Sequence, residues 1–373
     1  MHILRFVASS LALVGCADGP CTPDTAAWDC GDACGPPGTL QWQRTLHNGR
    51  SLSASVAVDA CDGIVVAGSV SPDADERADM FVARHDPDGA LAWQSVLVAP
   101  EGADGIAALV AAPDGGVYVV GMTSDFTNYV EIDGDTWVAR LDREGEPIWT
   151  RSFDDGDEAR ARDLALTPDG IVVADVTGLR WFSSDGDLIR ELPSDPDSPY
   201  DPGALSGAWT VASAADGRVA ADSGGALLLL DADGRERWRR DDTTGLRDLT
   251  FTPDGTLLAL HGGVGGEIQA HDPAGEILWT FPLEKGPDIL LADERGIVLG
   301  GSDSHHNQGR AWIAALDPDG RERWFWAIDQ PVQTWTSGLA IAPDGSVLAT
   351  VGLGNGQLSG FNDHDLWIGR FTR

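Results

Sequence analysis

Short apolar segments alternate with turn-forming tetrapeptides from residue 38 to residue 373. In a typical unit, a small apolar segment such as LALTPDG (164–170) is followed by a longer apolar run such as IVVADVT (171–177). Neither segment has the spacing of an amphipathic helix, and both have the length of a strand. Runs that are apolar at successive positions must be covered on both faces, so we expect stacked sheets.

The polar breaks between these segments read Asp-Pro-Asp-Gly or a close variant, as at 86–89 and 317–320. Asp at the first position, Pro at the second and Gly at the fourth favour a type I turn with the glycine at positive φ. Such a turn joins adjacent antiparallel strands. A calcium loop is the less favoured interpretation, because the distal Glu and further oxygen ligands of an EF-hand are missing.

A tryptophan ends most units, as in ALDPDGRERW (315–324). The equivalent positions are Trp42, Trp93, Trp149, Arg190, Trp238, Trp279 and Trp324. Their intervals of 51, 56, 41, 48, 41 and 45 residues match the period of a four-stranded propeller blade. We interpret the tryptophans as side chains wedged between neighbouring sheets near the rim.

The first and last units are each incomplete. Residues 38–46 form an outer strand with no preceding partner, and residues 365–373 form a third strand with no outer strand after it. Together they make one blade. We therefore predict an all-β fold over residues 38–373, a seven-bladed β-propeller of four-stranded antiparallel blades whose last blade is closed by the N-terminal strand.

The repeats also carry a family resemblance. The segments VARLDREGEPIW (138–149) and DLALTPDGIVVADVT (163–177) resemble bacterial β-propeller repeats of the SBBP type. The Gly-x-x-x-Trp ending is similar to quinoprotein-like (PQQ-type) propeller repeats. The resemblance covers residues 38–373 and implies architecture, because such propellers include enzymes, scaffolds and surface proteins. The quinoprotein dehydrogenases use a longer, eight-bladed ring and a vicinal cysteine pair that this chain lacks.

The N-terminus predicts export. Residues 1–15 contain one basic residue, Arg5, and an apolar run of signal-peptide length, and the ending Leu-Val-Gly-Cys resembles a bacterial lipobox with Cys16 as the lipidated residue. An ordinary secretory signal is the alternative. We expect residues 16–37 to be a Cys-rich tether, and the mature protein to be a lipoprotein of the bacterial envelope, on the periplasmic side or at the cell surface.

The cysteines and the net charge limit the kinds of site and partner that we expect. In an oxidising compartment, four cysteines permit two disulfides in any of three connectivities; they are Cys21, Cys30, Cys34 and Cys61. Their spacing does not match a zinc site. A formal net charge of −34 repels phosphate backbones, so we exclude nucleic acid as a partner and interpret the acidic residues as a solubilising surface.

Candidate binding residues lie in the connections between the second and third strands, which are long in the first, second, sixth and seventh blades. Loops on a rigid scaffold commonly carry binding sites. The sixth and seventh blades bring together side chains of metal-ligand type: His305, His306, His364, Asp303, Asp363 and Asp365. Their spacing fits no known motif, so solvated loop is the alternative. Phe126 and Tyr129 are candidate partner contacts.

No G-x-S-x-G elbow or H-E-x-x-H motif is present. We therefore predict a monomeric, non-enzymatic binding or scaffold module that is anchored to the membrane, contacts a protein or glycan and has no cofactor beyond a candidate divalent metal. Two alternatives stay open. One is an envelope-assembly scaffold resembling the propeller lipoprotein of the outer-membrane β-barrel machinery, and the other is a metal- or quinone-dependent enzyme with its site in the propeller funnel.

Overall fold

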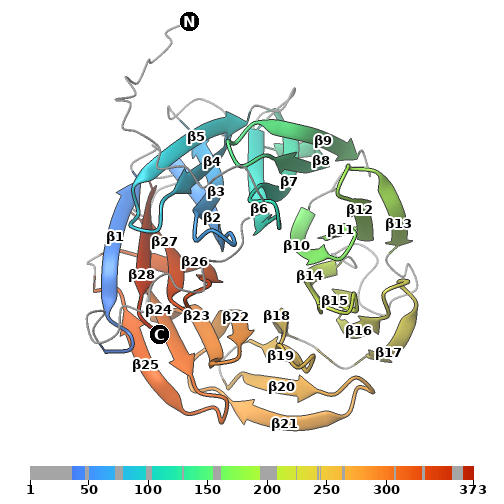
Figure 1. The fold of residues 1–373 in the computed structure, drawn as a ribbon, viewed down its shortest axis with the longest axis vertical. Helices are drawn as coiled ribbons and strands as arrows, with labels where there is room; N and C mark the ends of the chain where they lie inside the picture. Colours follow the sequence, from blue (N-terminus) through green and yellow to red (C-terminus); the bar gives the residue numbers. More distant parts are fainter. Residues whose placement is uncertain are drawn as a thin grey trace, which may run out of the picture.

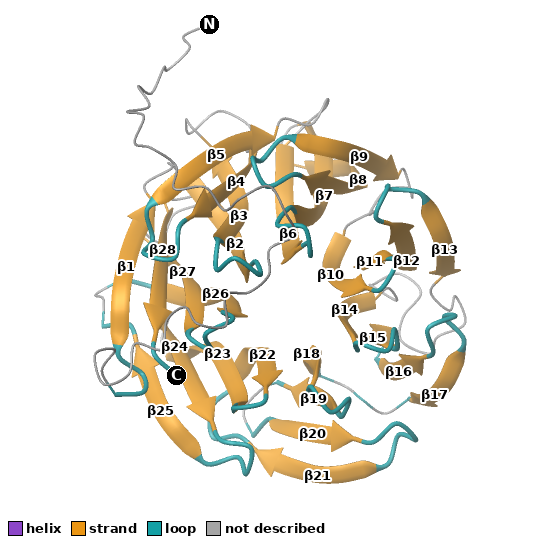
Figure 2. Cartoon of the chain, in the orientation of Figure 1, coloured by secondary structure: helices purple, strands orange, loops and turns teal. Residues whose placement is uncertain are grey.

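The computed structural model describes residues 36–46, 50–71, 79–97, 103–127, 130–153, 161–193, 208–223, 225–241, 243, 245–262, 265–305, 308–329, 332–354 and 364–373. Regular structure in these ranges consists of 28 strands without helices (Figure 2). Accordingly, the described residues include no helix that could cross a membrane. The strands form a ring of blades around a central axis (Figure 1).

There are seven blades of four antiparallel strands; five are separate sheets, and blades 7 and 1 are linked by one parallel residue pair, Arg50–His364. Blade 1 contains β2 (Arg50–Val58), β3 (Ile64–Ser71), β4 (Asp79–His85) and β5 (Leu91–Leu97). Blade 2 contains β6 (Ala103–Ala111), β7 (Val117–Thr127), β8 (Val130–Leu141) and β9 (Pro147–Phe153). Blade 3 contains β10 (Ala161–Thr167), β11 (Gly170–Asp175), β12 (Gly178–Ser183) and β13 (Leu188–Pro193). Blade 4 contains β14 (Ala208–Ser213), β15 (Val219–Ser223), β16 (Ala226–Leu230) and β17 (Glu236–Arg240).

The remaining three blades repeat the same order. Blade 5 contains β18 (Leu246–Phe251), β19 (Leu257–His261), β20 (Glu267–His271) and β21 (Ile277–Pro282). Blade 6 contains β22 (Pro287–Asp293), β23 (Gly296–His305), β24 (Gln308–Leu316) and β25 (Glu322–Ala327). Blade 7 contains β26 (Thr334–Ile341), β27 (Val347–Gly354), β28 (His364–Phe371) and β1 (Leu40–Leu46). The predicted seven-bladed, all-β propeller is confirmed, including the closing strand.

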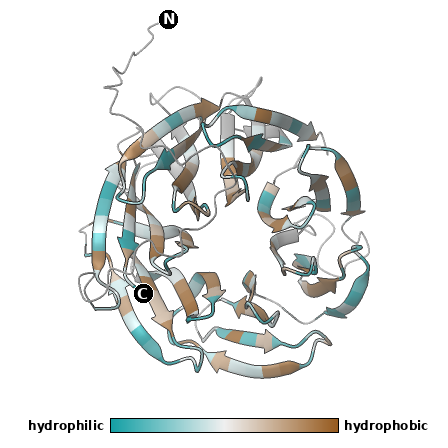
Figure 3. Ribbon diagram, viewed as in Figure 1, coloured by the Kyte–Doolittle hydropathy of each residue, from teal (hydrophilic) through white to brown (hydrophobic). Residues whose placement is uncertain are grey.

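The four strands of a blade, called A to D from the axis outward, differ in burial in the way that stacking requires (Figure 1). Every residue of β11 and of β16 is buried, because B and C strands are sandwiched between neighbouring blades. The D strands alternate between covered and exposed positions, and their apolar and polar bands are visible along the rim in Figure 3. The core is thus a series of layers between blades.

The A–B and C–D turns lie at one end of the blades, which we call the turn face. The B–C and D–A connections form the opposite loop face. In the C–D turn of blade 6, Gly320 adopts φ +81° and donates its N–H to Asp317 O at 2.9 Å. Asp317 Oδ1 accepts from the N–H groups of Asp319 (3.0 Å) and Arg321 (2.9 Å). The side-chain oxygen of this aspartate is therefore used within its own turn, as the turn interpretation predicts.

The rim tryptophans join adjacent blades. Trp93 of blade 1 lies over Gly145 of blade 2, where an added Cβ would come within 2.6 Å of the indole, and Trp93 Nε1 donates to Arg143 O at 2.8 Å. The same contact between a tryptophan and a turn glycine joins four further pairs of adjacent blades: Trp42–Gly89, Trp149–Gly186, Trp238–Gly275 and Trp324–Gly38. Arg190 lies over Gly234 as the equivalent residue of blade 3.

Trp279 departs from the predicted wedge. Phe281, two residues further along β21, lies over Gly320 in its place. Trp279 is consequently 39% exposed. The sequence pattern did not indicate this difference, because Trp279 has the same repeat position as the other tryptophans.

The ring closes inside blade 7, where β1 pairs antiparallel with β28 from Leu40–Phe371 to Leu46–Leu366. At the turn face, two separate chain ends rebuild a C–D turn. Gly38 N donates to Thr372 O at 2.8 Å, and Thr372 N donates to Thr39 O at 3.0 Å. Thr372 Oγ1 accepts from Thr39 N at 2.9 Å, as the aspartate oxygen does in a continuous turn.

Replacing Gly89 with Ala should destabilise the fold strongly. Gly89 has φ +79°, and a Cβ there would lie 2.8 Å from the Trp42 ring, so both backbone strain and a steric clash oppose the substitution. Gly265→Ala is the matched control, because Gly265 has φ +80° but nothing within 4 Å of an added Cβ. In urea unfolding, we expect Gly89→Ala to lose about 2–4 kcal/mol and Gly265→Ala about 1 kcal/mol. Equal losses would contradict the wedge.

Replacing Thr372 with Val tests the rebuilt turn, because it preserves the shape and removes Oγ1. This atom bonds Thr39 N and donates to Pro36 O at 2.6 Å. We expect the free energy of unfolding to fall by about 1–2 kcal/mol. Thr45→Val, at an exposed position of β1, should change it by less than about 0.5 kcal/mol. A Thr372→Val protein as stable as the Thr45→Val protein would show that the turn contributes nothing to closure.

Candidate functional site

The loop face is built up on one side of the ring. Strands β7 and β8 have 11 and 12 residues, and β23 and β24 have 10 and 9, whereas β19 and β20 of blade 5 have five each. Much of what we expected to be loop in blades 2 and 6 is therefore β-hairpin. These hairpins belong to the same arc of the ring as blades 7 and 1, whose B–C connections contain residues 355–363 and 72–78, outside the described residues.

The predicted ligand residues fall at the tips of these strands. Asp303 lies in β23, and Lys285 Nζ contacts its Oδ2 at 2.6 Å. Asp365 lies in β28, in register with Leu353. His305 ends β23 and His364 begins β28, and the structure places the backbone of both without describing the side chains. The other two predicted residues, His306 and Asp363, lie outside the described residues.

The structure therefore describes the side chains of only two of the six predicted ligands, Asp303 and Asp365. In the described part of the chain, no group of three or more His, Cys, Asp or Glu side chains could hold a metal ion. The two candidate partner contacts are also only partly placed: Phe126 lies in β7 in register with Glu131, and Tyr129 is outside the described residues. A metal site on this face stays a prediction.

Lys285 is the chain's single lysine, and it fixes the loop-face connection between blades 5 and 6. Besides its ion pair with Asp303, its ammonium lies 5.1 Å from the ring centre of Phe325 and 5.9 Å from that of Trp312. A lysine held over two aromatic rings and a carboxylate gains cation–π attraction as well as charge pairing. Asp303 is engaged in this contact and is not a free ligand.

Of the cysteines that the sequence analysis singled out, the structure describes only Cys61. Cys16, Cys21, Cys30 and Cys34 lie outside the described residues, so lipidation and the tether stay predictions. Cys61 lies in the A–B turn of blade 1 and is disulfide-bonded. The connectivity of the four tether and turn cysteines stays open.

A cluster that the sequence interpretation missed lies on the A strands around the central axis. Thr210 of β14 lies between two carboxyl groups: its Oγ1 is 3.2 Å from Asp163 Oδ2 of β10 and 3.4 Å from Asp248 Oδ1 of β18. Both aspartates come from the same tripeptide, Arg-Asp-Leu, at the same place in blades 3 and 5. That repeated tripeptide was the available signal.

These carboxyl groups also join adjacent blades. Asp163 Oδ2 accepts from Val211 N of blade 4 at 2.9 Å, and Asp248 Oδ2 accepts from Leu290 N of blade 6 at 2.6 Å. Each acceptor is needed because the A strands carry a bulge at this level, where the neighbouring strand leaves an N–H unpaired. The cluster is thus part of the inner packing of the ring.

Burial raises the pKa of Asp163 to about 6. Burial, assisted by the negative charge of Asp163, raises the pKa of Asp248 to about 7. The geometry agrees with these directions, since the single hydroxyl proton of Thr210 can be donated to one carboxylate only. The second contact is satisfied when the other carboxyl carries a proton, so the cluster holds about one proton near neutral pH.

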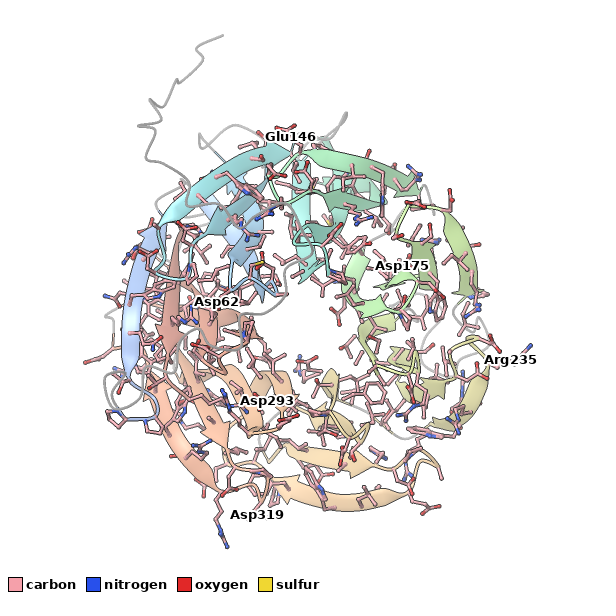
Figure 4. The ribbon with its side chains drawn as sticks, viewed as in Figure 1. Asp62, Glu146, Asp175, Arg235, Asp293 and Asp319 are labelled. Carbon is pink, nitrogen blue, oxygen red and sulfur yellow. The ribbon has the colours of Figure 1, made fainter. Side chains whose placement is uncertain are left out.

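The turn face is held together by arginines that cross the junctions between blades. Arg370 of blade 7 contacts Asp344 of its own A–B turn (3.0 Å), and across the junction it contacts Asp62 (2.8 Å) and Pro87 O (3.0 Å) of blade 1. In Figure 4, Asp62 lies on the inner side of the ring and Arg235 lies at its outer edge. Other arginines also reach a backbone carbonyl of the next blade, among them Arg84, Arg140, Arg218 and Arg295.

The proton held by the Asp163–Thr210–Asp248 cluster predicts a pH dependence. Because the folded protein retains protons that an unfolded chain releases above about pH 4, stability should fall as pH rises from about 5 to about 8. In the double variant Asp163→Asn/Asp248→Asn, this dependence should shrink, so that the variant gains on the order of 2 kcal/mol relative to wild type across the range. Denaturant unfolding at several pH values measures it.

Asp319→Asn, at an exposed turn position of blade 6, is the control and should preserve the wild-type pH dependence. Parallel curves for wild type and the double Asn variant would refute the shared proton.

Comparison with known proteins supports this architecture. The family model described as Outer membrane protein assembly factor BamB matches residues 134–334, more than half of the 373-residue chain. No curated protein matches the sequence.

Two solved structures show the same fold. A chain in the "Crystal Structure of Mitotic Checkpoint Complex" has a TM-score of 0.58 and 14% identity, with 99% of each chain covered. Raptor from Chaetomium thermophilum has a TM-score of 0.55 and 14% identity, with 87% of this chain and 29% of that chain covered. Identities this low show the fold alone. Family membership rests on the repeat match, and the chain belongs to the PQQ-type β-propeller family described as outer membrane protein assembly factor BamB.

Proposed function

We propose that the protein is a non-enzymatic binding or scaffold module of a bacterial cell envelope. The observation that carries the proposal is the uneven loop face, where the hairpins β7–β8 and β23–β24 extend beyond the short B and C strands of blades 3, 4 and 5. A ring closed by a strand ladder is a rigid support, and projecting elements on one arc of such a support offer a surface of fixed shape to a partner.

The specific form we propose is an assembly scaffold. The family description names an outer membrane assembly factor, and the N-terminal lipobox-like segment ending at Cys16 would anchor the chain to a membrane. The proposal includes a monomeric ring, a protein or glycan partner, and no nucleic acid partner. The net charge of −34 supports the last point, because it repels phosphate backbones.

Cell fractionation and cross-linking test this function together. The wild-type protein should fractionate with envelope membranes, and Cys16→Ser should move it to a soluble exported fraction. A photo-reactive group at the β7–β8 hairpin of the wild-type protein should cross-link to a specific envelope component. Replacing residues 125–133 by Asn-Gly, which trims the hairpin, should remove most contact with that component, because the projecting surface is lost.

Arg235→Ala is the matched control, since Arg235 is exposed on the turn face with a side chain that is 77% accessible. It should cross-link like wild type. An unchanged partner yield from the trimmed variant would contradict a binding role for this hairpin, and membrane retention of Cys16→Ser at the wild-type level would contradict the lipid anchor.

A further inference from the structure

The seven junctions between blades on the turn face are not all filled in the same way. Arginine side chains cross six of them: Arg84 from blade 1 to 2, Arg140 from blade 2 to 3, Arg190 from blade 3 to 4, Arg218 from blade 4 to 5, Arg295 from blade 6 to 7, and Arg370 from blade 7 to 1. Between blades 3 and 4, the turns also approach directly, with Pro168 Cγ 3.6 Å from a Cβ built on Gly217. In the part of the chain that the structure describes, no arginine contact crosses the junction between blades 5 and 6 on the turn face, where Ala270 and Phe281 occupy the corresponding positions.

Register identifies the missing group. Arg84, Arg140 and Arg370 occupy one repeat position, each opposite the rim tryptophan of the D strand. In blade 5 the residue at this position is Ala270, which pairs with Trp279. Blades 3, 4 and 6 also lack an arginine at this position, but another arginine of the same blade crosses each of their junctions. Blade 5 shows no such replacement among its described residues.

The acceptors for an arginine remain. Asp254 and Thr256 of the blade 5 A–B turn correspond to Asp344 and Ser346, which bind Arg370 at 3.0 Å and 2.7 Å. Across the junction, Pro318 corresponds to Pro87, whose carbonyl accepts from Arg370. These three blade 5–6 residues line an open groove of about 530 Å³.

The groove also has an aromatic wall. Trp279 lines it and is 39% exposed, because Phe281 has taken the packing place over Gly320. Leu278 and Ile277, beside Trp279 on the edge strand β21, are 56% and 41% exposed. No other rim tryptophan in the described residues combines this exposure with a groove.

Negative charge surrounds the opening. Asp254 and Glu294 lie on opposite sides, on the turns of blades 5 and 6. Hydrogen bonds from Thr252 and Thr256 lower the pKa of Asp254, so it is anionic at neutral pH. Asp293, also in the lining, pairs with Arg373 at 2.6 Å, so its charge is already matched within the chain. Figure 4 shows Asp293 on the inner side of blade 6.

We propose that the blade 5–6 groove binds an arginine side chain of a partner polypeptide, which completes the junction as the chain's own arginines complete the others. The inference rests on the proposed binding role and assigns a chemistry to one of its contacts. The planar guanidinium can pair with Asp254, donate to the Pro318 carbonyl and lie against the Trp279 indole at the same time. A lysine ammonium has no such fork and matches the site less well.

Charge favours the same class of partner. A chain with a net charge of −34 attracts basic segments over distances of about the Debye length, so an arginine-bearing strand would be drawn to this surface. The exposed edge of β21 beside the groove could pair with the backbone of that strand, which would seat its side chain next to Trp279.

Calorimetric titration of the full chain with blocked tripeptides tests the groove directly. Acetyl-Gly-Arg-Gly-amide should bind saturably and more weakly as salt is raised. The same peptide with citrulline or lysine in place of arginine should bind roughly tenfold more weakly or worse. Ala270→Arg should abolish binding of the arginine peptide, because it supplies the missing guanidinium in cis, and it should preserve or raise the melting temperature.

Asp254→Asn is a second test variant, because it removes a charge from the groove without filling it. It should weaken the binding of the arginine peptide roughly tenfold. The control Asp233→Asn, at an exposed turn position of blade 4, should bind like wild type. Absence of saturable arginine binding by wild type would overturn the inference, as would undiminished binding by a folded Ala270→Arg or by Asp254→Asn. Such a failure together with intact envelope cross-linking would remove the groove assignment alone, whereas loss of cross-linking with intact arginine binding would remove the loop-face proposal alone.

Discussion

The ladder between β1 and β28 is the contact on which the rest of the ring depends. The two faces of a blade's inner strands are covered by its two neighbours, one on each side, so an open ring would leave two apolar faces in water. The chain closes the ring inside blade 7, through the antiparallel backbone ladder of β1 and β28, instead of at a junction held by side chains. Gly38, Thr39 and Thr372 then restore the turn that the break removes.

Between blades, a common geometry is met by different side chains. A flat group lies over a turn glycine at every junction, and that group is an indole in five places, the guanidinium of Arg190 in one and the ring of Phe281 in one. The turn face shows the same tolerance, because arginines reach the next blade from a C strand or from an A–B turn. Because these positions accept different side chains, one junction can lack its crossing group without loss of the fold.

The sequence pattern was sufficient for the architecture because its signals are local. Asp-Pro-Asp-Gly fixes a turn within four residues, and the recurring tryptophan counts the blades. The features that it did not indicate depend on neighbours from another blade: the outward displacement of Trp279 by Phe281, the contact of Asp163 with Thr210, and the reach of Arg370 to Asp62. Long B–C segments were correctly placed on one arc, but paired backbone turned them into hairpins in blades 2 and 6. The histidine and N-terminal assignments stay predictions.

The position of the seam has a mechanical consequence. Residue 36 enters the ring at the turn face, beside Thr372 and at the first residue pair of the β1–β28 ladder. Tension transmitted through an N-terminal tether would therefore load the Gly38–Thr372 contact first and then separate β1 from β28 one pair at a time. Such peeling requires less force than shearing all pairs at once. A tethered propeller of this design would yield by releasing one rim strand, while the three inner strands of blade 7 and the other six blades keep their packing.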